Sequence, residues 1–147
     1  LRPVEVDAHG LMTAIEELAS GTEKWYNVPC RFRADSNVPV DDNNVATQVF
    51  YIAREAITNA LRHAKPRSIE IELKDEDDSI VLRVRDDGIG MPAQRAPESG
   101  IGLRIMQYRA TLIGAALEIG PAEGGGTMVT CLLKQERAHD HTTDAVH

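Results

Sequence analysis

Residues 86–102 combine residue types that could hold a nucleotide. An alternating apolar run ends at Asp86, a Gly-Ile-Gly turn follows at 88–90, and a second Gly-Ile-Gly at 100–102 precedes a helical pattern. A carboxylate at a strand end can accept a hydrogen bond from the exocyclic amine of a base, and glycines at a helix start let a phosphate reach backbone N–H groups. The stretch therefore predicts base recognition at one end and phosphate recognition at the other, although a lone Gly-x-Gly is usually an ordinary turn.

A second group of polar residues lies on a long predicted helix, which the acidic and amide residues at 41–44 cap and Pro66 stops. Four polar residues recur at i, i+4, i+7 and i+8 beside its apolar stripe, and therefore share one face: Glu55, Asn59, Arg62 and His63. A glycine run at 124–126, followed by Thr127, opens the last predicted strand. Each of these residues alone also fits a solvated or structural role, so it is their combination that indicates a site.

The remaining pattern supplies the elements that position these residues. Apolar periodicity predicts helices from Leu11 to about Gly21, from about 41 to Ala64, and from Gly102 to Gly114, with a loop at 91–99. Alternation predicts strands at 28–33, 69–74, 80–85, 117–119 and 127–133, with an acidic loop at 75–78 and a connection or edge strand at 36–40. This order predicts an α/β (α+β) two-layer sandwich, with three helices on one face of a mixed, mostly antiparallel sheet.

The composition is that of one globular domain. The chain has 147 residues, of which 42% are hydrophobic and 27% charged, and no apolar run approaches the ~18 residues of a membrane span. A net charge of -7 argues against a general nucleic-acid binder or membrane binder. Cys30 and Cys131 lie in strand-like runs and are interpreted as buried hydrophobes of a cytoplasmic protein. We expect the domain at residues 1–134, followed by a polar tail at 135–147.

Four segments in order resemble the motifs of a known superfamily. They read REAITNALRHA, DDGIGMP, SGIGLRIMQYRA and GGGTMVTCLL. They are similar to the N, G1, G2 and final glycine-threonine boxes of the ATP-binding superfamily shared by gyrase, the 90-kDa heat-shock chaperones, histidine kinases and MutL. The resemblance covers about Leu11 to Leu133 and implies a Bergerat-type fold. GIGLRIMQYRA after so brief a loop looks like the catalytic domain of sensor histidine kinases with a short ATP lid.

The resemblance implies a role for each matching residue, with ATP and Mg²⁺ as cofactors. Asn59 matches the Mg²⁺ ligand and Glu55 the general base that polarises the attacking imidazole. Arg62 and His63 lie where the family often has Lys-His and are expected to approach the phosphates, with Lys65 adding charge. Arg62 departs from the family's lysine, keeping the charge but changing its geometry.

The resemblance assigns roles at the adenine end and at the phosphate end of the site in the same way. Asp86 matches the acid that accepts from the adenine amino group, and Thr127 would join it in a water-mediated contact. Two glycines, Gly88 and Gly90, would let the base approach the backbone, and Met91 either packs on the base or fills the core. The phosphate end would be formed by Gly100, Ile101, Gly102 and Leu103 at the helix start.

The resemblance also implies partners. Histidine kinases phosphorylate a histidine on a separate dimerising helix pair, and a response regulator, here of the class with a helix-turn-helix output domain, acts downstream. His9 lacks the neighbours of a phospho-acceptor, so we expect the acceptor domain to lie outside this chain and the isolated domain to be monomeric, without nucleic-acid or direct membrane contact. The alternatives are a stand-alone anti-sigma serine kinase of the same superfamily and a non-catalytic nucleotide switch, against which the presence of both Glu55 and Asn59 argues.

Overall fold

The computed structural model describes residues 6–35, 38–89 and 97–135. Within them the chain forms three α-helices, one π-helical turn and five strands. In chain order these are α1 (Leu11–Tyr26), β1 (Cys30–Ala34), α2 (Asn43–Asn59), η1 (Ala60–Ala64), β2 (Ile69–Glu76), β3 (Ser79–Asp86), α3 (Pro97–Leu112), β4 (Ala116–Pro121) and β5 (Thr127–Lys134). No helix in the described part is both long and apolar enough to cross a bilayer.

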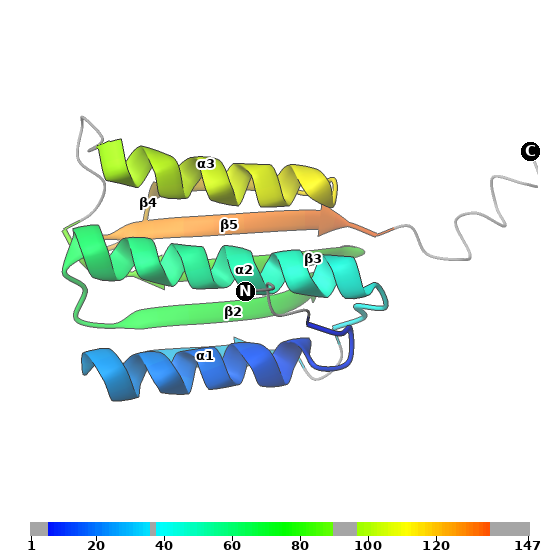
Figure 1. Cartoon of the computed structure of the whole chain (residues 1–147), viewed down its shortest axis with the longest axis horizontal. Helices are drawn as coiled ribbons and strands as arrows, with labels where there is room; N and C mark the ends of the chain where they lie inside the picture. Colours follow the sequence, from blue (N-terminus) through cyan, green and yellow to red (C-terminus); the bar gives the residue numbers. More distant parts are fainter. Residues whose placement is uncertain (1–5, 36–37, 90–96, 136–147) are drawn as a thin grey trace, which may run out of the picture.

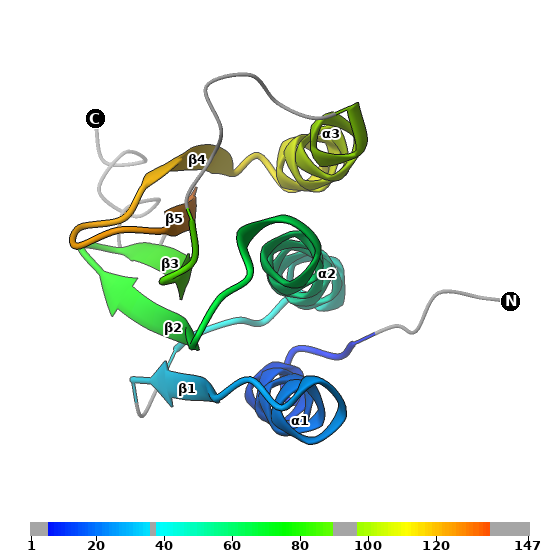
Figure 2. The ribbon, with the colours of Figure 1, turned by 90° about the vertical axis from the view of Figure 1, so that its left-hand side faces the viewer.

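The strands form one sheet in the order β1-β2-β3-β5-β4, in which β1 and β2 are parallel and the other neighbours antiparallel. The three helices lie side by side on one face of this sheet (Figures 1 and 2). The predicted two-layer sandwich with a mixed, mostly antiparallel sheet is therefore confirmed. This topology brings the end of β3 next to the start of β5, which are far apart in the sequence.

Alternating strand residues and the apolar helix stripes meet in one core. Ile71 and Leu73 of β2, Ile52 of α2 and Met106 of α3 are all fully buried and belong to the same cluster. Each such side chain contributes about 1.5–3 kcal/mol by leaving water. This packing fixes α2 and α3 on the sheet, so the polar residues along their seam are held by a rigid support.

Several local boundaries differ from the sequence prediction, and α1, for example, continues beyond Gly21 to Tyr26. Helix α3 begins at Pro97 rather than at Gly102, because proline suits the first helical position and a glycine inside a helix costs only about 1 kcal/mol. The strands β2 and β3 extend into the acidic stretch, which leaves Asp77 and Asp78 alone in the turn. Their φ angles of 49° and 61° are those of the hairpin turn that continues the strand twist.

Candidate functional site

A groove runs along the seam between α2 and α3. Its volume is about 450 Å³, and we call it the α2–α3 groove. Glu55, Asn59 and Arg62 of α2 and η1 line it together with Ile101 and Gly102 of α3. The structure thus brings together five residues that the sequence predicts for the phosphate side of the site. The remaining lining residues are Tyr51, Arg54, Thr58, Ile105 and Arg109.

Gly102 lies close against the polar side chains of α2. A Cβ atom placed there would lie 2.6 Å from Oδ1 of Asn59 and 3.0 Å from Oε1 of Glu55. Only glycine leaves room for both polar side chain ends at this point. The sequence predicts that Gly102 is the first residue of the helix and offers a free backbone N–H. In the structure α3 begins five residues earlier, at Pro97, so the N–H of Gly102 is placed to form an ordinary hydrogen bond within the helix. Gly100 lies in the first turn with open space where its Cβ would be.

A buried carboxylate closes the end of β3. Asp86 is 6% exposed, and its Oδ1 accepts a hydrogen bond of 2.9 Å from the Gly88 N–H. Thr127 is its cross-strand neighbour on β5. Burial raises the pKa of Asp86, against the opposing hydrogen bonds from the backbone of Gly88 and Thr127, and the charge of Asp87 adds to the rise. A carboxylate offers about four acceptor positions, so acceptor capacity remains for a ligand.

Asp87, unlike Asp86, has a structural role. Its Oδ1 accepts hydrogen bonds of 2.8 Å from the backbone N–H groups of Arg67 and Ser68, and the Ser68 hydroxyl lies 3.0 Å from its Oδ2. Burial opposes ionisation, but these hydrogen bonds outweigh it and lower the pKa of Asp87. Asp87 thereby ties the turn before β2 to the end of β3, a role that nothing in the sequence pattern identified.

The backbone that follows β3 is hydrogen-bonded to the end of η1. The Ile89 N–H donates to the carbonyl oxygen of Ala64 at 2.8 Å. A Cβ at Gly88 would collide with the same carbonyl group, and one at Gly126 would collide with the backbone of Asp86. Because Ala64 ends the π turn that follows Asn59, the end of β3 and the polar face of α2 are joined through η1.

The π turn separates residues that the α-helical spacing places together. Arg62 is exposed and lines the α2–α3 groove, whereas His63 is half-buried and is not among the groove residues. The Nε2 atom of His63 is buried and has no hydrogen-bond partner in the described part of the chain. Such wide turns shift the residues that follow them and occur often at functional sites. Lys65, which ends the turn, is exposed and has a φ of 48°.

Other predicted residues lie elsewhere or outside the described residues. Leu103 is 9% exposed and packs in the core, so it supports α3 from below the groove. Gly90 and Met91 lie outside the described residues, as do most of the loop at 91–99 and the tail beyond Gln135. Cys30 and Cys131 are buried, and the pKa of each thiol is raised to about 11, by burial alone for Cys131 and by burial together with the charge of Glu23 for Cys30.

The donor set fits a magnesium ion that is held mainly by a ligand. No group of three or more His, Cys, Asp or Glu residues that could hold a metal occurs among residues 6–35, 38–89 and 97–135. Mg²⁺ is commonly bound through one or two protein oxygens, with phosphates and water completing its octahedron. The half-buried amide oxygen of Asn59, held against Gly102, has the chemistry of such a single hard ligand and would be the group to hold the ion.

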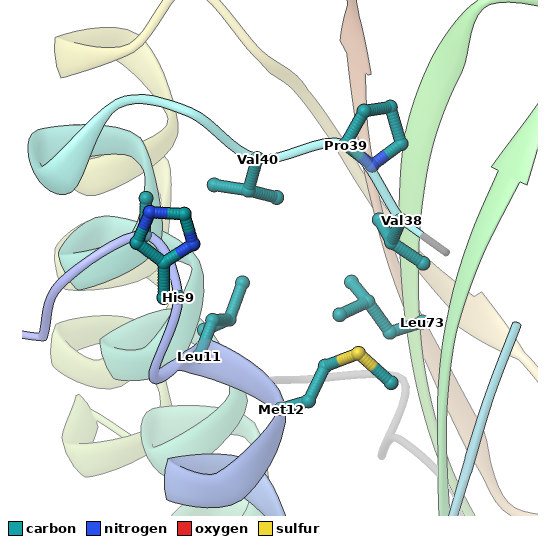
Figure 3. Close-up of a pocket in the computed structure, with 8 residues that line it drawn as sticks. His9, Leu11, Met12, Val38, Pro39, Val40 and Leu73 are labelled. Atoms are coloured by element: carbon teal, nitrogen blue, oxygen red, sulfur yellow. The ribbon is translucent and has the colours of Figure 1, made fainter. Parts of the chain in front are cut away.

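His9 lies in a separate pocket of about 310 Å³ between the start of α1 and the sheet. Figure 3 shows His9, Leu11 and Met12 on one side of this pocket, facing Val38, Val40 and Leu73. The pocket shares no residue with the α2–α3 groove.

The sequence analysis missed a group of residues further along the groove. Arg109 of α3 contacts Gln48 and Tyr51 of α2, and Arg54 lies over the same tyrosine ring. Among the described residues that line the α2–α3 groove there are three arginines, Arg54, Arg62 and Arg109, and one carboxylate, that of Glu55. The only available signal was helical spacing, which puts Tyr51 one turn before Glu55 but cannot show which residue of another helix faces it.

Comparisons with known proteins agree on one family. The model of the family described as "Histidine kinase-, DNA gyrase B-, and HSP90-like ATPase" matches residues 44–137. The oxygen sensor histidine kinase NreB of Staphylococcus carnosus is 30% identical over 131 residues, covering 88% of this chain and 38% of the relative. The sensor protein NarQ homolog of Haemophilus influenzae is 36% identical over 124 residues, covering 84% and 21% respectively. The chain therefore spans less than half the length of these curated relatives.

Solved structures with the same fold include two from this group. The ATP binding domain of PrrB from Mycobacterium tuberculosis superposes with a TM-score of 0.68 at 15% identity, covering 91% of this chain and 98% of that chain. The histidine kinase domain of the blue-light activated kinase from Erythrobacter litoralis EL346 gives 0.66 at 24% identity, with coverages of 92% and 64%. At these identities the likeness establishes the fold alone.

Proposed function

The chain belongs to the histidine kinase-, DNA gyrase B- and HSP90-like ATPase family, and we propose that residues 1–134 form the ATP-binding catalytic domain of a sensor histidine kinase. The domain binds Mg-ATP and transfers the γ-phosphoryl group to a histidine on a separate dimerisation domain. The observation that carries the proposal is the close packing of Glu55 and Asn59 against Gly102 in a groove that also holds three arginines. Despite the net charge of -7, this groove is locally positive and suits an anionic nucleotide.

Adenine is recognised at the end of β3. The Asp86 carboxylate accepts from the adenine amino group, and Thr127 supports a water-mediated contact beside it. Guanine presents a carbonyl oxygen at the same position, which a carboxylate repels. Gly88, which has no side chain, admits the base to the backbone, while the roles predicted for Gly90 and Met91 lie outside the described residues.

The phosphates lie toward the α2–α3 groove. The amide oxygen of Asn59 holds Mg²⁺, which, when bound, neutralises charge on the phosphate oxygens. Arg62 and Lys65 supply positive charge, and the unpartnered Nε2 of His63 offers a further polar contact. At the start of α3, Gly100 and Ile101 approach the phosphates, while Gly102 gives the close helix contact that keeps Asn59 in place and Leu103 anchors the helix in the core.

Glu55 acts on the incoming histidine rather than on the nucleotide. Its Oε1 is held beside the Asn59 amide at Gly102, so the base and the ion ligand face the same reaction space. A positioned general base contributes about 10²–10⁴-fold in rate, and the rest of phosphoryl transfer comes from positioning and charge.

The acceptor helix docks on the exposed side of α3. Ile101, Ile105, Tyr108 and Leu112 are 61%, 37%, 65% and 47% exposed, and their 4-3-4 spacing is that of a coiled-coil seam. Ile101 and Ile105 also line the α2–α3 groove, so a helix that packs on these four residues presents its histidine to Glu55. The sensor kinases named above are longer than this chain, which leaves room in such proteins for a helix of this kind. We place the domain in the cytoplasm, monomeric when isolated, with a response regulator downstream.

The anti-sigma serine kinase is the second candidate. It requires the same ATP site but a serine acceptor on a different protein. The relative named an oxygen sensor histidine kinase favours histidine as the acceptor.

Titration calorimetry with ATP and GTP at matched Mg²⁺ tests the nucleotide assignment. We expect clear preference for ATP, and we expect Asp86→Asn to weaken ATP binding by about 1–3 kcal/mol, the cost of an unmet buried hydrogen-bond partner. Equal affinities for the two nucleotides would remove the adenine assignment.

A further inference from the structure

Arg109 joins α3 to α2 through two uncharged partners. Its Nη1 donates to Oε1 of Gln48 at 3.0 Å, and its Cζ lies 4.5 Å from the centroid of the Tyr51 ring. Gln48 and Tyr51 are 9% and 8% exposed, so the half-buried guanidinium packs between the helices. We call these three residues the Arg109 clamp. Within the described ranges no carboxylate lies at ion-pair distance from Arg109.

Neighbouring residues hold both partners of Arg109 in place. The Phe50 ring meets the Tyr51 ring edge-on at a centroid distance of 5.3 Å, and Cζ of Arg54 lies 5.5 Å from the same ring. Asn44 Oδ1 lies 3.5 Å from Nε2 of Gln48. The clamp therefore rests on side chains that are themselves oriented, and it has a defined geometry.

The Arg109 clamp and the contact at Gly102 lie at two positions along the same pair of helices, α2 and α3. Gly102 and Arg109 are seven residues apart on α3, and Gln48 and Glu55 are seven residues apart on α2. Seven residues are about two turns, or roughly 10 Å along a helix. Gly102 has no side chain, so it cannot itself fix the position of α3 relative to Glu55 and Asn59. A rigid helix held at Arg109 transmits that position to Gly102.

We propose that Arg109 is a positioning residue, whose clamp on Gln48 and Tyr51 sets α3 against α2 and thereby holds Gly102 on Asn59 and Glu55. The proposal rests on the proposed function in one respect, the role of Asn59 toward Mg²⁺. Arginine suits the task because its planar group can stack on a ring and donate in its plane at once, which a lysine ammonium cannot do.

Nucleotide titrations separate positioning from simple stability. We expect Arg109→Gln and Tyr51→Leu each to lower Mg-ATP affinity by about 10-fold, because the Gly102 contact that keeps Asn59 in place for Mg²⁺ loses its alignment. Affinity for ADP without Mg²⁺, which reports the Asp86 end of the site, should change less than about twofold. Arg109→Lys keeps the charge but loses the planar group, so it should fall between wild type and Arg109→Gln.

Two control variants lie in α3 or next to its end. Arg104→Gln removes an exposed arginine of α3, and Ile113→Val makes a small packing loss just beyond the helix end. Neither should alter the ratio of ATP affinities with and without Mg²⁺. If Arg109→Gln lowers only the melting temperature and leaves this ratio unchanged, Arg109 is a structural residue and the proposal fails.

A double-mutant cycle in denaturant, without nucleotide, tests the clamp by itself. We expect Arg109→Gln combined with Tyr51→Leu to lose less stability than the sum of the single variants, because both remove the same contact. Additive losses would overturn the clamp. Failure of the wild type to bind Mg-ATP would instead count against the proposed function, and the cycle would still decide whether Arg109 and Tyr51 are coupled.

Discussion

Gly102→Ala offers a test in which stability and function should separate. The added methyl group would lie 2.6 Å from Asn59 Oδ1, whereas ordinary contacts begin near 3.4 Å, so the amide must retreat by about 0.8 Å. Alanine favours a helix over glycine by about 0.8–1.0 kcal/mol. Forcing a side chain off its rotamer costs about 0.5–1.5 kcal/mol. The two terms nearly cancel, so the free energy of unfolding should change by less than about 1 kcal/mol.

The functional cost of the same change is larger. A displacement approaching 1 Å can reduce a reaction rate by about 100-fold, and both Asn59 and Glu55 are displaced by this methyl group. We expect phosphoryl transfer by Gly102→Ala to fall by about 10- to 100-fold, with a smaller loss of Mg-ATP affinity. Urea unfolding, calorimetric titration with Mg-ATP and radiolabelled transfer should be measured on the same protein sample.

Two other glycine-to-alanine variants serve as controls for Gly102→Ala. Gly21 lies in helix α1 with nothing within 4 Å of an added Cβ, so Gly21→Ala should gain helix stability without any change in transfer. At Gly88 the added Cβ meets the backbone carbonyl of Ala64, which cannot rotate away, so Gly88→Ala should destabilise the fold. A Gly102→Ala protein that transfers phosphate at the wild-type rate would refute the close-packing argument, and a loss of several kcal/mol in its stability would make Gly102 a purely structural glycine.

Two further predictions concern single polar groups. Burial raises the folded-state pKa of Asp86, so its ionised form opposes folding at neutral pH and this penalty disappears as the pH falls and the group is protonated. Asp86→Asn should therefore melt at a higher temperature than wild type at pH 7, with the difference fading toward pH ~4, and a lower melting temperature at pH 7 would contradict this. Asn59→Ala should lose the Mg²⁺ dependence of ATP affinity, and a variant that keeps the wild-type metal effect would exclude Asn59 as the ligand.

Local periodicity accounts for what the sequence predicted well. Glu55 and Asn59 are one helical turn apart, so their common face follows from α-helix geometry alone. The cap of α2 was also predictable, since the Asp42 carboxylate accepts from the N–H groups of Asn44 and Val45 at 2.7 and 3.2 Å. Strand alternation pointed only to the acidic pair at the end of the strand, and the family motif selected Asp86 from that pair.

Tertiary contacts account for what the sequence could not predict. The start of α3 at Pro97 precedes the first apolar periodic residue, so the pattern gave no sign of it. The π turn at Ala60–Ala64 follows a normal helical pattern in the sequence and is fixed by its contacts with Gly88 and Ile89. The Arg109 clamp joins residues 61 positions apart, a pairing that one chain's periodicity does not reveal.

The central claim is that Asn59 serves binding while Glu55 serves chemistry, and Glu55→Gln tests it most directly. The measurement is radiolabelled transfer from Mg-ATP to a supplied helix pair that carries the acceptor histidine, with ATP affinity determined on the same samples. We predict that Glu55→Gln binds Mg-ATP within about twofold of wild type but transfers at least about 100-fold more slowly, and that the chain alone labels itself little. Undiminished transfer by Glu55→Gln would contradict the account, because it would remove Glu55 from the reaction.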